Sequence, residues 1–208
     1  MKYRNKPDDD AKRFLPPNGS SRKTIRYKKS EVIFFEGDES TAMFYVKSGA
    51  LKLTLVSASG KEVVMCVRDG GALFGESCIS LGVRVRLHNA VALTETHLVR
   101  IDRASILRML RGGGDSAIEF VSFLLDQNAA LQTDLATRLV GSTHESLLGV
   151  ISGLTRIKNS QPALHGITQQ TVAEMMGMSR QRVNALMERF GLSLSKQRAG
   201  QAAPKHMP

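Results

Sequence analysis

The sequence predicts an α+β protein in which an N-terminal antiparallel β-barrel, of the double-stranded β-helix or jelly-roll type, precedes a long helix and a C-terminal helix-turn-helix domain. Short apolar runs separated by turn residues occupy residues 25–101, a pattern typical of a sandwich or barrel. A helical apolar stripe follows over 116–139, and residues 167–190 place small and apolar side chains where two crossing helices need them. With 208 residues, 42% of them hydrophobic, the chain can bury two cores.

The first 24 residues are predicted to form a flexible basic segment. They are rich in charge and end in the Pro- and Gly-containing run 16–21, which favours a linker. Residues 1–30 carry a net charge of +7 and residues 161–208 a net charge of +4, whereas 31–160 carry −1. A basic C-terminal part on a neutral body suits contact with phosphate groups, although a solvated tail explains the first 30 residues equally well.

Residues 25–114 are predicted to form the barrel. Leu51, Leu53 and Leu55 alternate with Lys52 and Thr54, which indicates a strand with one mostly apolar face. Turn signals such as 36–38 and 59–61 end the apolar runs. Helical periodicity takes over after the last of these strands and breaks at 112–114, three consecutive glycines.

Cysteine and histidine usage argues against several kinds of chemistry. Cys66 and Cys78 lie among apolar residues, so we expect buried free thiols, no metal and no cofactor. A cupin-like enzyme would need histidines paired on one strand, and the sequence contains no such pair and no catalytic constellation, so no enzyme is expected. No segment is long and apolar enough to span a bilayer and the N-terminus lacks a signal-peptide core, so we expect a cytoplasmic protein with no membrane contact.

The long helix, over residues 115–140, is predicted to mediate dimerisation. Its stripe steps by three and four residues and comprises Val121, Leu124, Asn128, Leu131 and Leu135. Such a stripe can also be an intrachain core. Because a small barrel covers only part of so long a helix, a parallel homodimer is favoured, with Asn128 fixing the register of the two copies.

The helix-turn-helix domain is predicted over residues 141–192. Counting from Gln169, the fifth position is the small Ala173, the ninth is Gly177 in the turn, and the fifteenth is the apolar Val183. A small fifth residue lets the helices cross closely, and glycine tolerates the left-handed turn. Thr168 and Ser179 are expected to cap the two helices; an ordinary helical hairpin is the alternative.

If this module binds double-stranded DNA, residues at the start of the second helix would contact base edges. Arginine can bridge guanine O6 and N7, and glutamine and asparagine can pair with adenine. The predicted base contacts are Arg180, Gln181 and Asn184. The predicted phosphate contacts are Thr168, Gln170, Ser179, Arg182 and Arg189.

A barrel, a long helix and a helix-turn-helix in this order resemble the Crp/Fnr superfamily of bacterial transcription regulators, over residues 25–192. The run 70–76, ending in Phe-Gly-Glu, resembles the phosphate-binding cassette of that family, and Arg86 follows ten residues after Glu76. The resemblance implies an effector pocket that includes Gly75, Glu76, Arg86 and Leu87. It implies four partners, namely double-stranded DNA, a second copy of the chain, RNA polymerase and an unidentified small-molecule effector.

The sequence departs from the cyclic-nucleotide-binding members at Leu87. At this point the sequences of those members read Arg-Ser-Ala or Arg-Thr-Ala, and the hydroxyl after the arginine donates to the phosphate. Leucine has no hydroxyl to donate. A cyclic nucleotide is therefore disfavoured, and we expect Gly75, Glu76 and Arg86 to maintain the barrel turn with an internal ion pair. An iron–sulfur sensor would need a missing cysteine cluster, and a haem sensor would depend on a lone histidine, His88 or His97.

The C-terminal end, residues 193–208, is predicted to be a flexible tail. Family members continue from the recognition helix into a β-hairpin wing, whereas no β-branched or aromatic residue follows Phe190 here. A shortened or missing wing is therefore expected. The alternative function that follows is a barrel-type sensor or interaction protein with a degenerate DNA-binding module.

Overall fold

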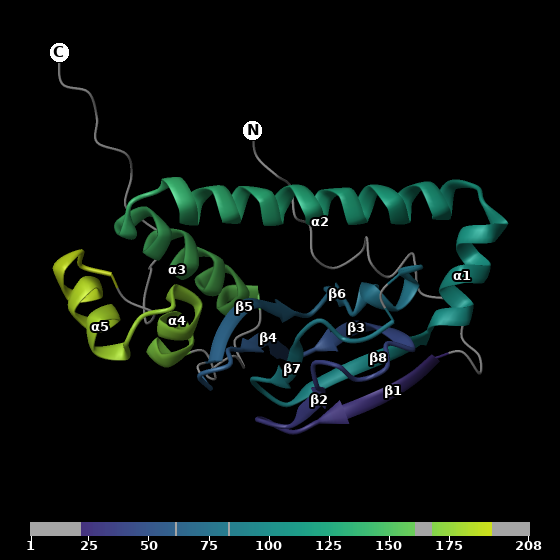
Figure 1. The fold of residues 1–208 in the computed structure, drawn as a ribbon, viewed down its shortest axis with the longest axis horizontal. Helices are drawn as coiled ribbons and strands as arrows, with labels where there is room; N and C mark the ends of the chain where they lie inside the picture. The colour runs from purple at the N-terminus through teal and green to yellow at the C-terminus, as the bar shows by residue number, and fades with distance from the viewer. Residues whose placement is uncertain (1–21, 61, 83, 161–167, 193–208) are drawn as a thin grey trace, which may run out of the picture.

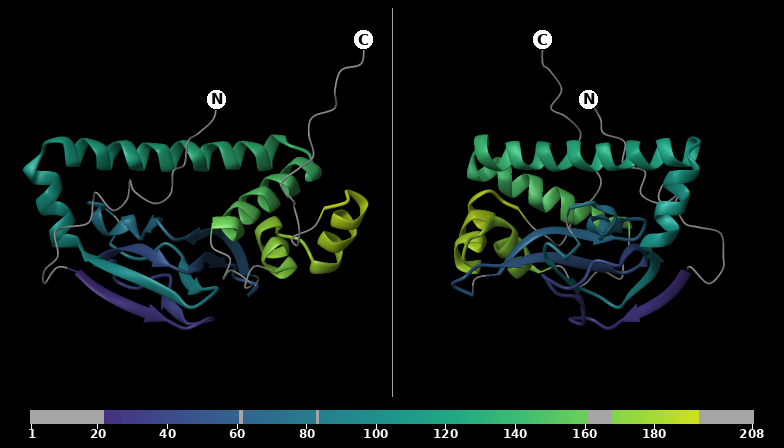
Figure 2. Two further views of the ribbon diagram at one scale, coloured as in Figure 1. Left: turned by 180° about the vertical axis from the view of Figure 1, so that it is seen from behind. Right: turned by 45° about the vertical axis from the view of Figure 1, so that its right-hand side comes forward.

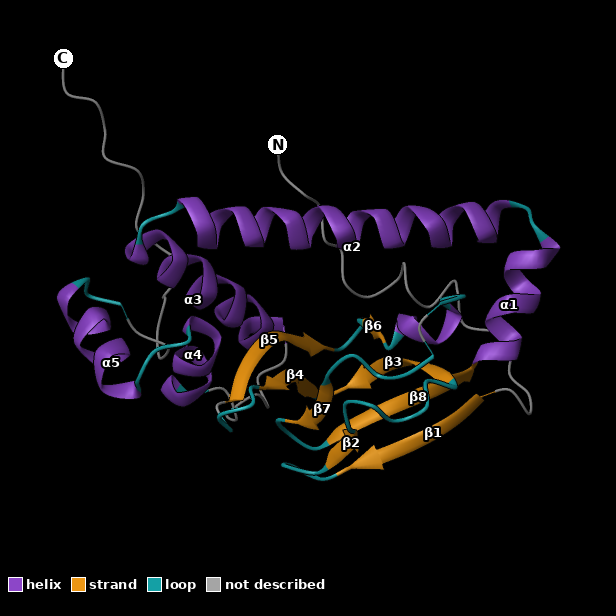
Figure 3. Ribbon diagram, viewed as in Figure 1, coloured by secondary structure: helices purple, strands orange, loops and turns teal. Residues whose placement is uncertain are grey.

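The structure, a computed structural model, describes residues 22–60, 62–82, 84–160 and 168–192. Two four-stranded antiparallel sheets form a barrel, and helices follow it along the chain (Figures 1 and 3). The predicted α+β order of barrel, long helix and helix-turn-helix is confirmed. The expected flexible segments 1–21 and 193–208, and with the latter the wing, lie outside the described residues.

The strands are β1 (Arg22–Tyr27), β2 (Val32–Phe34), β3 (Ala42–Ser48), β4 (Ala50–Val56), β5 (Glu62–Asp69), β6 (Leu73–Phe74), β7 (Asn89–Ala92) and β8 (Thr96–Asp102). The helices are the 3-10 helix η2 (Glu76–Ile79), α1 (Arg103–Gly112), α2 (Asp115–Val140), α3 (Thr143–Ser160), α4 (Gln169–Met176) and α5 (Arg180–Arg189). The strand order is β1-β8-β3-β6 in one sheet and β2-β7-β4-β5 in the other.

Side chains from both sheets meet in the barrel core. Its centre is a stack of three phenylalanines, Phe34, Phe44 and Phe74, whose ring centroids lie 5.3–6.0 Å apart. Successive side chains of strand β3 point to opposite faces of the sheet, and both faces are buried. Phe44 points into the barrel, whereas Met43 and Tyr45 pack in a second cluster with residues of α1 and α2. The first helices are therefore anchored on the outer face of one sheet.

The barrel begins earlier than the sequence predicted. Residues 22–24 were expected in the flexible segment, but they pair with β8 in the register Arg22↔Ile101 to Thr24↔Val99. Strand β1 is at the edge of its sheet, where side chains such as Lys23 remain in solvent while the backbone is paired. The charged composition therefore concealed a strand.

Helix α3 begins at Thr143, directly after a cap formed by Ser142 and Glu145. The Ser142 hydroxyl accepts a hydrogen bond from the Glu145 backbone N–H at 3.2 Å, and the Glu145 carboxylate accepts one from the Ser142 backbone N–H at 2.7 Å. This reciprocal pair is a capping box. Hydrogen bonds from the Ser142 N–H and hydroxyl lower the pKa of Glu145 below its ordinary value.

The helix-turn-helix packs against the barrel of its own chain. Ala50, Val64 and Val67 of β4 and β5 share a buried cluster with residues of α3, α4 and α5. Figure 2 shows from two further directions that α2 runs the length of the molecule, with α1 at one end and α5 at the other. Among the described residues, no helix is long and apolar enough to cross a membrane.

Candidate functional site

Helices α4 and α5 form the predicted helix-turn-helix, and the expected local features are confirmed. The Thr168 hydroxyl accepts a hydrogen bond from the Thr171 N–H, and the Ser179 hydroxyl accepts one from the Arg182 N–H. Gly177 ends α4 in the left-handed conformation, at φ +63°. These three residues fix where each helix begins and where the turn occurs.

The buried side of the module consists of the residues that the spacing predicted. Val172, Ala173 and Val183 are almost completely buried, as is Met187 one turn after Val183. The small Ala173 lets α5 cross close to α4. With these side chains inward, the N-terminal residues of α5 are left on the opposite side.

The predicted base-contact residues lie differently on α5. Arg180 and Gln181 are exposed at its first turn. Asn184 is half-buried, and its Oδ1 atom is buried without a hydrogen-bond partner among the described residues. Arg180 and Gln181 are therefore available to a ligand as they stand, whereas Asn184 would have to turn outward.

The predicted phosphate-contact residues all lie at the surface of the module. Gln170, Arg182 and Arg189 are exposed, as are the two capping residues. The Gln170 amide donates to Glu174 at 3.0 Å, and the Arg189 guanidinium lies 5.6 Å from the centre of the Phe190 ring. The guanidinium groups of Arg182 and Arg189 have no ion-pair partner in the described part of the chain, so both are available to a phosphate group.

The expected effector pocket has its arginine turned into the barrel. Arg86 is only 4% exposed and donates to the backbone oxygens of Ala42 at 2.7 Å and Gly75 at 3.2 Å. Its guanidinium carbon lies 4.3 Å from the centre of the Phe34 ring, a cation–π contact. Burial lowers the pKa of this guanidinium from its ordinary value.

Gly75 permits this arrangement. It adopts φ +81°, and a Cβ atom built on it would lie 2.6 Å from Arg86 Nη1. The glycine is therefore required both by its left-handed backbone and by the close approach of the guanidinium. The structure thus agrees with the expectation that these residues maintain the barrel turn.

The ion pair expected between Glu76 and Arg86 is not formed, which corrects that part of the prediction. Glu76 is exposed, and Arg86 uses backbone carbonyl oxygens instead of a carboxylate because it is folded inward onto the phenylalanines. Leu87 is 55% exposed. The neighbouring His88 is half-buried against Phe34, and burial lowers its pKa below the ordinary value.

The exposed apolar face of α2 is wider than the predicted seam and omits one of its residues, Leu124. Leu124 is half-buried and packs on the cluster beneath α1 and α2, so it does not belong to the exposed face. The exposed large side chains on α2 are Ile118, Val121, Leu125, Leu131, Leu135, Leu139 and Val140. The two apolar stripes are adjacent on the helix, and the barrel covers the one that contains Phe120 and Leu124.

A polar pair interrupts this exposed face. The Gln132 amide donates to Asn128 Oδ1 at 2.9 Å, one helical turn apart. Asn128 and Gln132 continue the three- and four-residue steps that link Val121 and Leu125 to Leu135. The face therefore has the apolar spacing of a two-helix seam with one polar layer in its middle.

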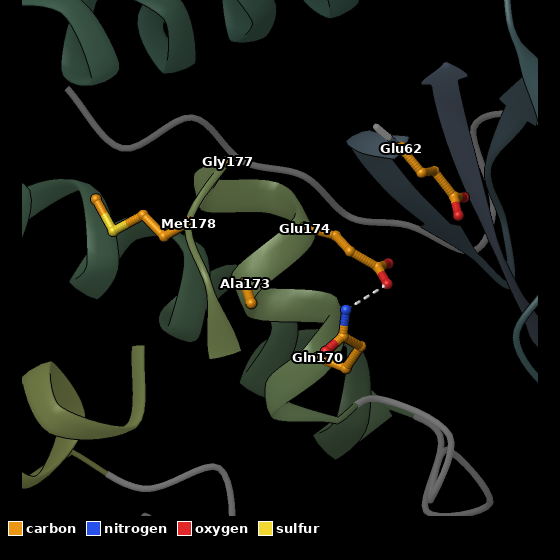
Figure 4. A pocket seen from close by; sticks show the side chains of 6 residues that line it. All are labelled: Glu62, Gln170, Ala173, Glu174, Gly177 and Met178. Atoms are coloured by element: carbon orange, nitrogen blue, oxygen red, sulfur yellow. Dashed lines mark hydrogen bonds between the residues drawn. The ribbon is translucent and has the colours of Figure 1, made fainter. Parts of the chain in front are cut away.

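Sequence reasoning missed an ion-pair cluster that joins the barrel to α4. Lys52 Nζ lies 2.9 Å from Glu62 Oε1 and 3.1 Å from Glu174 Oε2. Figure 4 shows Glu174 on α4 pointing towards β5, beside a pocket of about 370 Å³. Burial alone would lower the pKa of Lys52, but its hydrogen bonds to both carboxylates outweigh burial and raise it. Nothing in the sequence signals this cluster, because its members become neighbours only when α4 docks on the barrel.

Comparisons with known proteins agree with this architecture. Residues 24–112 match the family model of the cyclic nucleotide-binding domain. A global nitrogen regulator from Synechocystis sp. is 27% identical over 173 residues, which cover 77% of this chain and 74% of that protein. A CRP-like cAMP-activated global transcriptional regulator from Mycobacterium tuberculosis is 22% identical over 171 residues, or 80% of this chain and 76% of that one.

The fold is shared with proteins of solved structure. FixK2 from Bradyrhizobium japonicum superposes with a TM-score of 0.68 at 14% identity, over 82% of this chain and 84% of that chain. The barrel, the long helix and the helix-turn-helix follow one another here in the order that the sequence pattern predicted. With its cyclic nucleotide-binding-type barrel, the chain is similar over most of its length to transcription regulators of the Crp/Fnr type.

Proposed function

We propose that this regulator acts in the cytoplasm as a homodimer that binds double-stranded DNA in a sequence-specific manner, with α5 in the major groove. The observation that carries the proposal is the division of α5 into two sides. Val183 and Met187 are buried in the module, whereas Arg180 and Gln181 are exposed at its N-terminal turn. The start of a recognition helix is the part that reaches base edges.

The chemistry of the exposed side chains assigns their roles. Arg180 can form two hydrogen bonds to guanine, and Gln181 can do the same with adenine. The caps support this role, because Ser179 and Thr168 cap the first turns of α5 and α4, where exposed hydroxyl and backbone N–H groups would meet the phosphates of a bound duplex. Arg182 and Arg189 add charge on the same module.

The second copy of the chain is proposed to pack along α2. Leu125 is 64% exposed and Leu139 is 75% exposed, on a face that runs along the helix. An exposed apolar face of this kind is typical of an interface, and its heptad-like steps suit a second parallel helix. Asn128 and Gln132 would then meet their counterparts and disfavour shifted registers.

The effector is proposed to be something other than cyclic AMP, although the Mycobacterium relative is named as cAMP-activated. A cyclic phosphate in the cassette needs free donors, and the guanidinium of Arg86 is already committed to Ala42 and Gly75. Leu87 offers no hydroxyl beside it. Activation of transcription would add a contact with RNA polymerase.

The test of base reading compares Arg180→Ala with Arg189→Ala on duplexes selected by the wild-type protein. Fluorescence anisotropy should show that Arg180→Ala loses about 1–3 kcal/mol of discrimination between the selected site and a site with one changed base pair. Arg189→Ala should weaken both duplexes equally, because a phosphate contact carries no sequence information. Unchanged discrimination by Arg180→Ala would contradict the assignment.

The test of the dimer is sedimentation equilibrium of Leu125→Glu against Thr133→Glu. Both side chains are exposed on α2, but Thr133 lies away from the apolar face. Leu125→Glu should dissociate the dimer by placing two like charges in its seam, and Thr133→Glu should leave it intact. A dimeric Leu125→Glu protein, or a monomeric wild type, would rule out this seam.

A further inference from the structure

A pocket rich in arginine lies at the end of the barrel where α1 begins. It has a volume of about 590 Å³ and is lined by the loop before β3, the loop before β7, the end of β8 and one side of α1 from its first to its last turn. None of Gly75, Glu76, Arg86 and Leu87 lines it. In Figure 1 and in both views of Figure 2, α1 and α5 are at opposite ends of the molecule, so the pocket is not part of the proposed DNA-binding face.

The charge of the pocket is strongly positive. Its arginines are Arg84, Arg100, Arg103, Arg108 and Arg111, and its carboxylates are only Glu39 and Asp102. Asp102 is paired with Arg100, so its charge is already used within the protein. Like charges in a concave site reinforce one another and concentrate anions there.

Two of the guanidinium groups are uncommitted. The side chains of Arg84 and Arg111 are exposed and have no hydrogen-bond or ion-pair partner in the described ranges. Arg103 donates its Nε–H to the Cys78 carbonyl at 2.6 Å, which holds the side chain in place and leaves its terminal N–H groups free. Arg108 likewise donates from one nitrogen only, to the Ser105 hydroxyl at 3.0 Å.

The shape and lining define the ligand. The volume falls within the range of small-molecule sites, roughly 300–1,000 Å³. Only Ala104 and Leu107 contribute apolar side chains, so the pocket suits a polar and multiply charged molecule. Guanidinium groups match tetrahedral phosphate oxygens with pairs of N–H donors. We propose that this pocket binds a compact small molecule carrying two or more linked phosphate groups.

The test is isothermal titration calorimetry of the full chain with sodium triphosphate at physiological salt. Wild-type protein should bind one triphosphate per chain. Each arginine that is removed should weaken binding about tenfold or more, so the double variant Arg84→Gln/Arg111→Gln should show both losses together. Arg84→Lys/Arg111→Lys, which keeps the charge and loses the paired donors, should fall between the two. The matched control is Lys28→Gln/Lys29→Gln, which removes the same charge from exposed side chains after β1 and should leave the affinity unchanged.

Three results would overturn the proposal. They are no saturable binding by the wild type, equal binding by the Arg84→Gln/Arg111→Gln protein, and an equal loss in the lysine control. A second arm titrates a random duplex into the same variants, because DNA phosphates share this chemistry. If Arg84→Gln/Arg111→Gln lost duplex affinity as well, the arginines would belong to a DNA contact and the small-molecule site would be refuted. Neither arm depends on sequence-specific DNA binding, so the two proposals can fail separately.

Discussion

Replacing Arg86 by methionine tests whether this residue maintains the barrel or serves a ligand. Methionine fills much of the same volume and has no donor. The substitution removes the short hydrogen bond to Ala42 O (2.7 Å), the longer one to Gly75 O (3.2 Å) and the contact with Phe34. Gly75 O also accepts from the Cys78 N–H at 3.3 Å, so the loss of its bond to Arg86 costs less.

The size of the effect follows from these contacts. A hydrogen bond to a charged donor contributes about 1.5–3 kcal/mol, and a desolvated cation–π contact about 2 kcal/mol. Burying a guanidinium has a desolvation cost, as the lowered pKa of Arg86 indicates. Replacing Arg86 removes this cost, which offsets part of the stability lost with its contacts. We expect Arg86→Met to lower the free energy of unfolding by about 3 kcal/mol, and hence Tm by about 6–12 °C.

Urea unfolding followed by circular dichroism measures this change. Arg84→Met is the matched control, since Arg84 is two residues away and its side chain is exposed and without a hydrogen-bond or ion-pair partner in the described ranges. It should change the free energy of unfolding by less than about 0.5 kcal/mol. If Arg86→Met were as stable as the wild type but abolished a measurable affinity for cyclic AMP, Arg86 would be a ligand residue and the reasoning would be wrong.

Three further predictions concern single residues. Gly177→Ala should destabilise the protein by roughly 1–2 kcal/mol, because alanine is strained at φ +63°. The control Gly149→Ala, inside α3, should stabilise it by roughly 0.5–1 kcal/mol, and equal effects of the two substitutions in urea unfolding would contradict this. Because burial keeps the pKa of His88 below that of the unfolded chain, about 6.5, folding stability should fall as the pH drops below that value, and His88→Phe should flatten the profile. An unchanged pH profile would show that His88 is not the titrating group. Burial raises the pKa of the Cys78 thiol to about 11, so a thiol reagent at pH about 8 should modify the half-buried Cys66 first. Rapid modification of both cysteines in the folded protein would contradict the burial of Cys78.

The helix-turn-helix could be predicted almost entirely from the sequence. Its caps, its turn and its inward positions depend on properties of single residues: a hydroxyl at Thr168 and Ser179, a missing side chain at Gly177, and small or apolar side chains at Ala173 and Val183. Each of these requirements is local, so residue spacing alone determines where the elements begin and end.

The direction of Arg86 could not be predicted in the same way. A Phe-Gly-Glu turn followed by an arginine is the same sequence whether the guanidinium faces a ligand or the core. Its direction depends on Phe34 and on the carbonyl oxygen of Ala42, both far away in the chain. The expected ion pair with Glu76 was wrong because the guanidinium bonds to carbonyl oxygens and packs on an aromatic ring inside the barrel.

The sequence predicted an apolar stripe on α2, but not which of its residues stay exposed. Two adjacent apolar stripes run along this helix, and periodicity shows both without saying which one the barrel covers. Gly113 and Gly114, both with positive φ, connect α1 to α2, and Leu124 packs on the cluster that these helices share with the barrel. The cluster of Lys52 with Glu62 and Glu174 could not be predicted either, because it forms only when α4 docks on the barrel.

The most direct test of the account is selection of bound sites from a random duplex pool at physiological salt, with and without added cyclic AMP. The account predicts a two-fold symmetric motif whose halves lie about one helical turn apart, because a parallel dimer presents two copies of α5. It also predicts the same motif in both arms, because Arg86 is not free to hold a cyclic phosphate. Uniform binding in both arms would contradict the proposed base reading by Arg180, and a motif only with cyclic AMP would contradict the interpretation of Arg86.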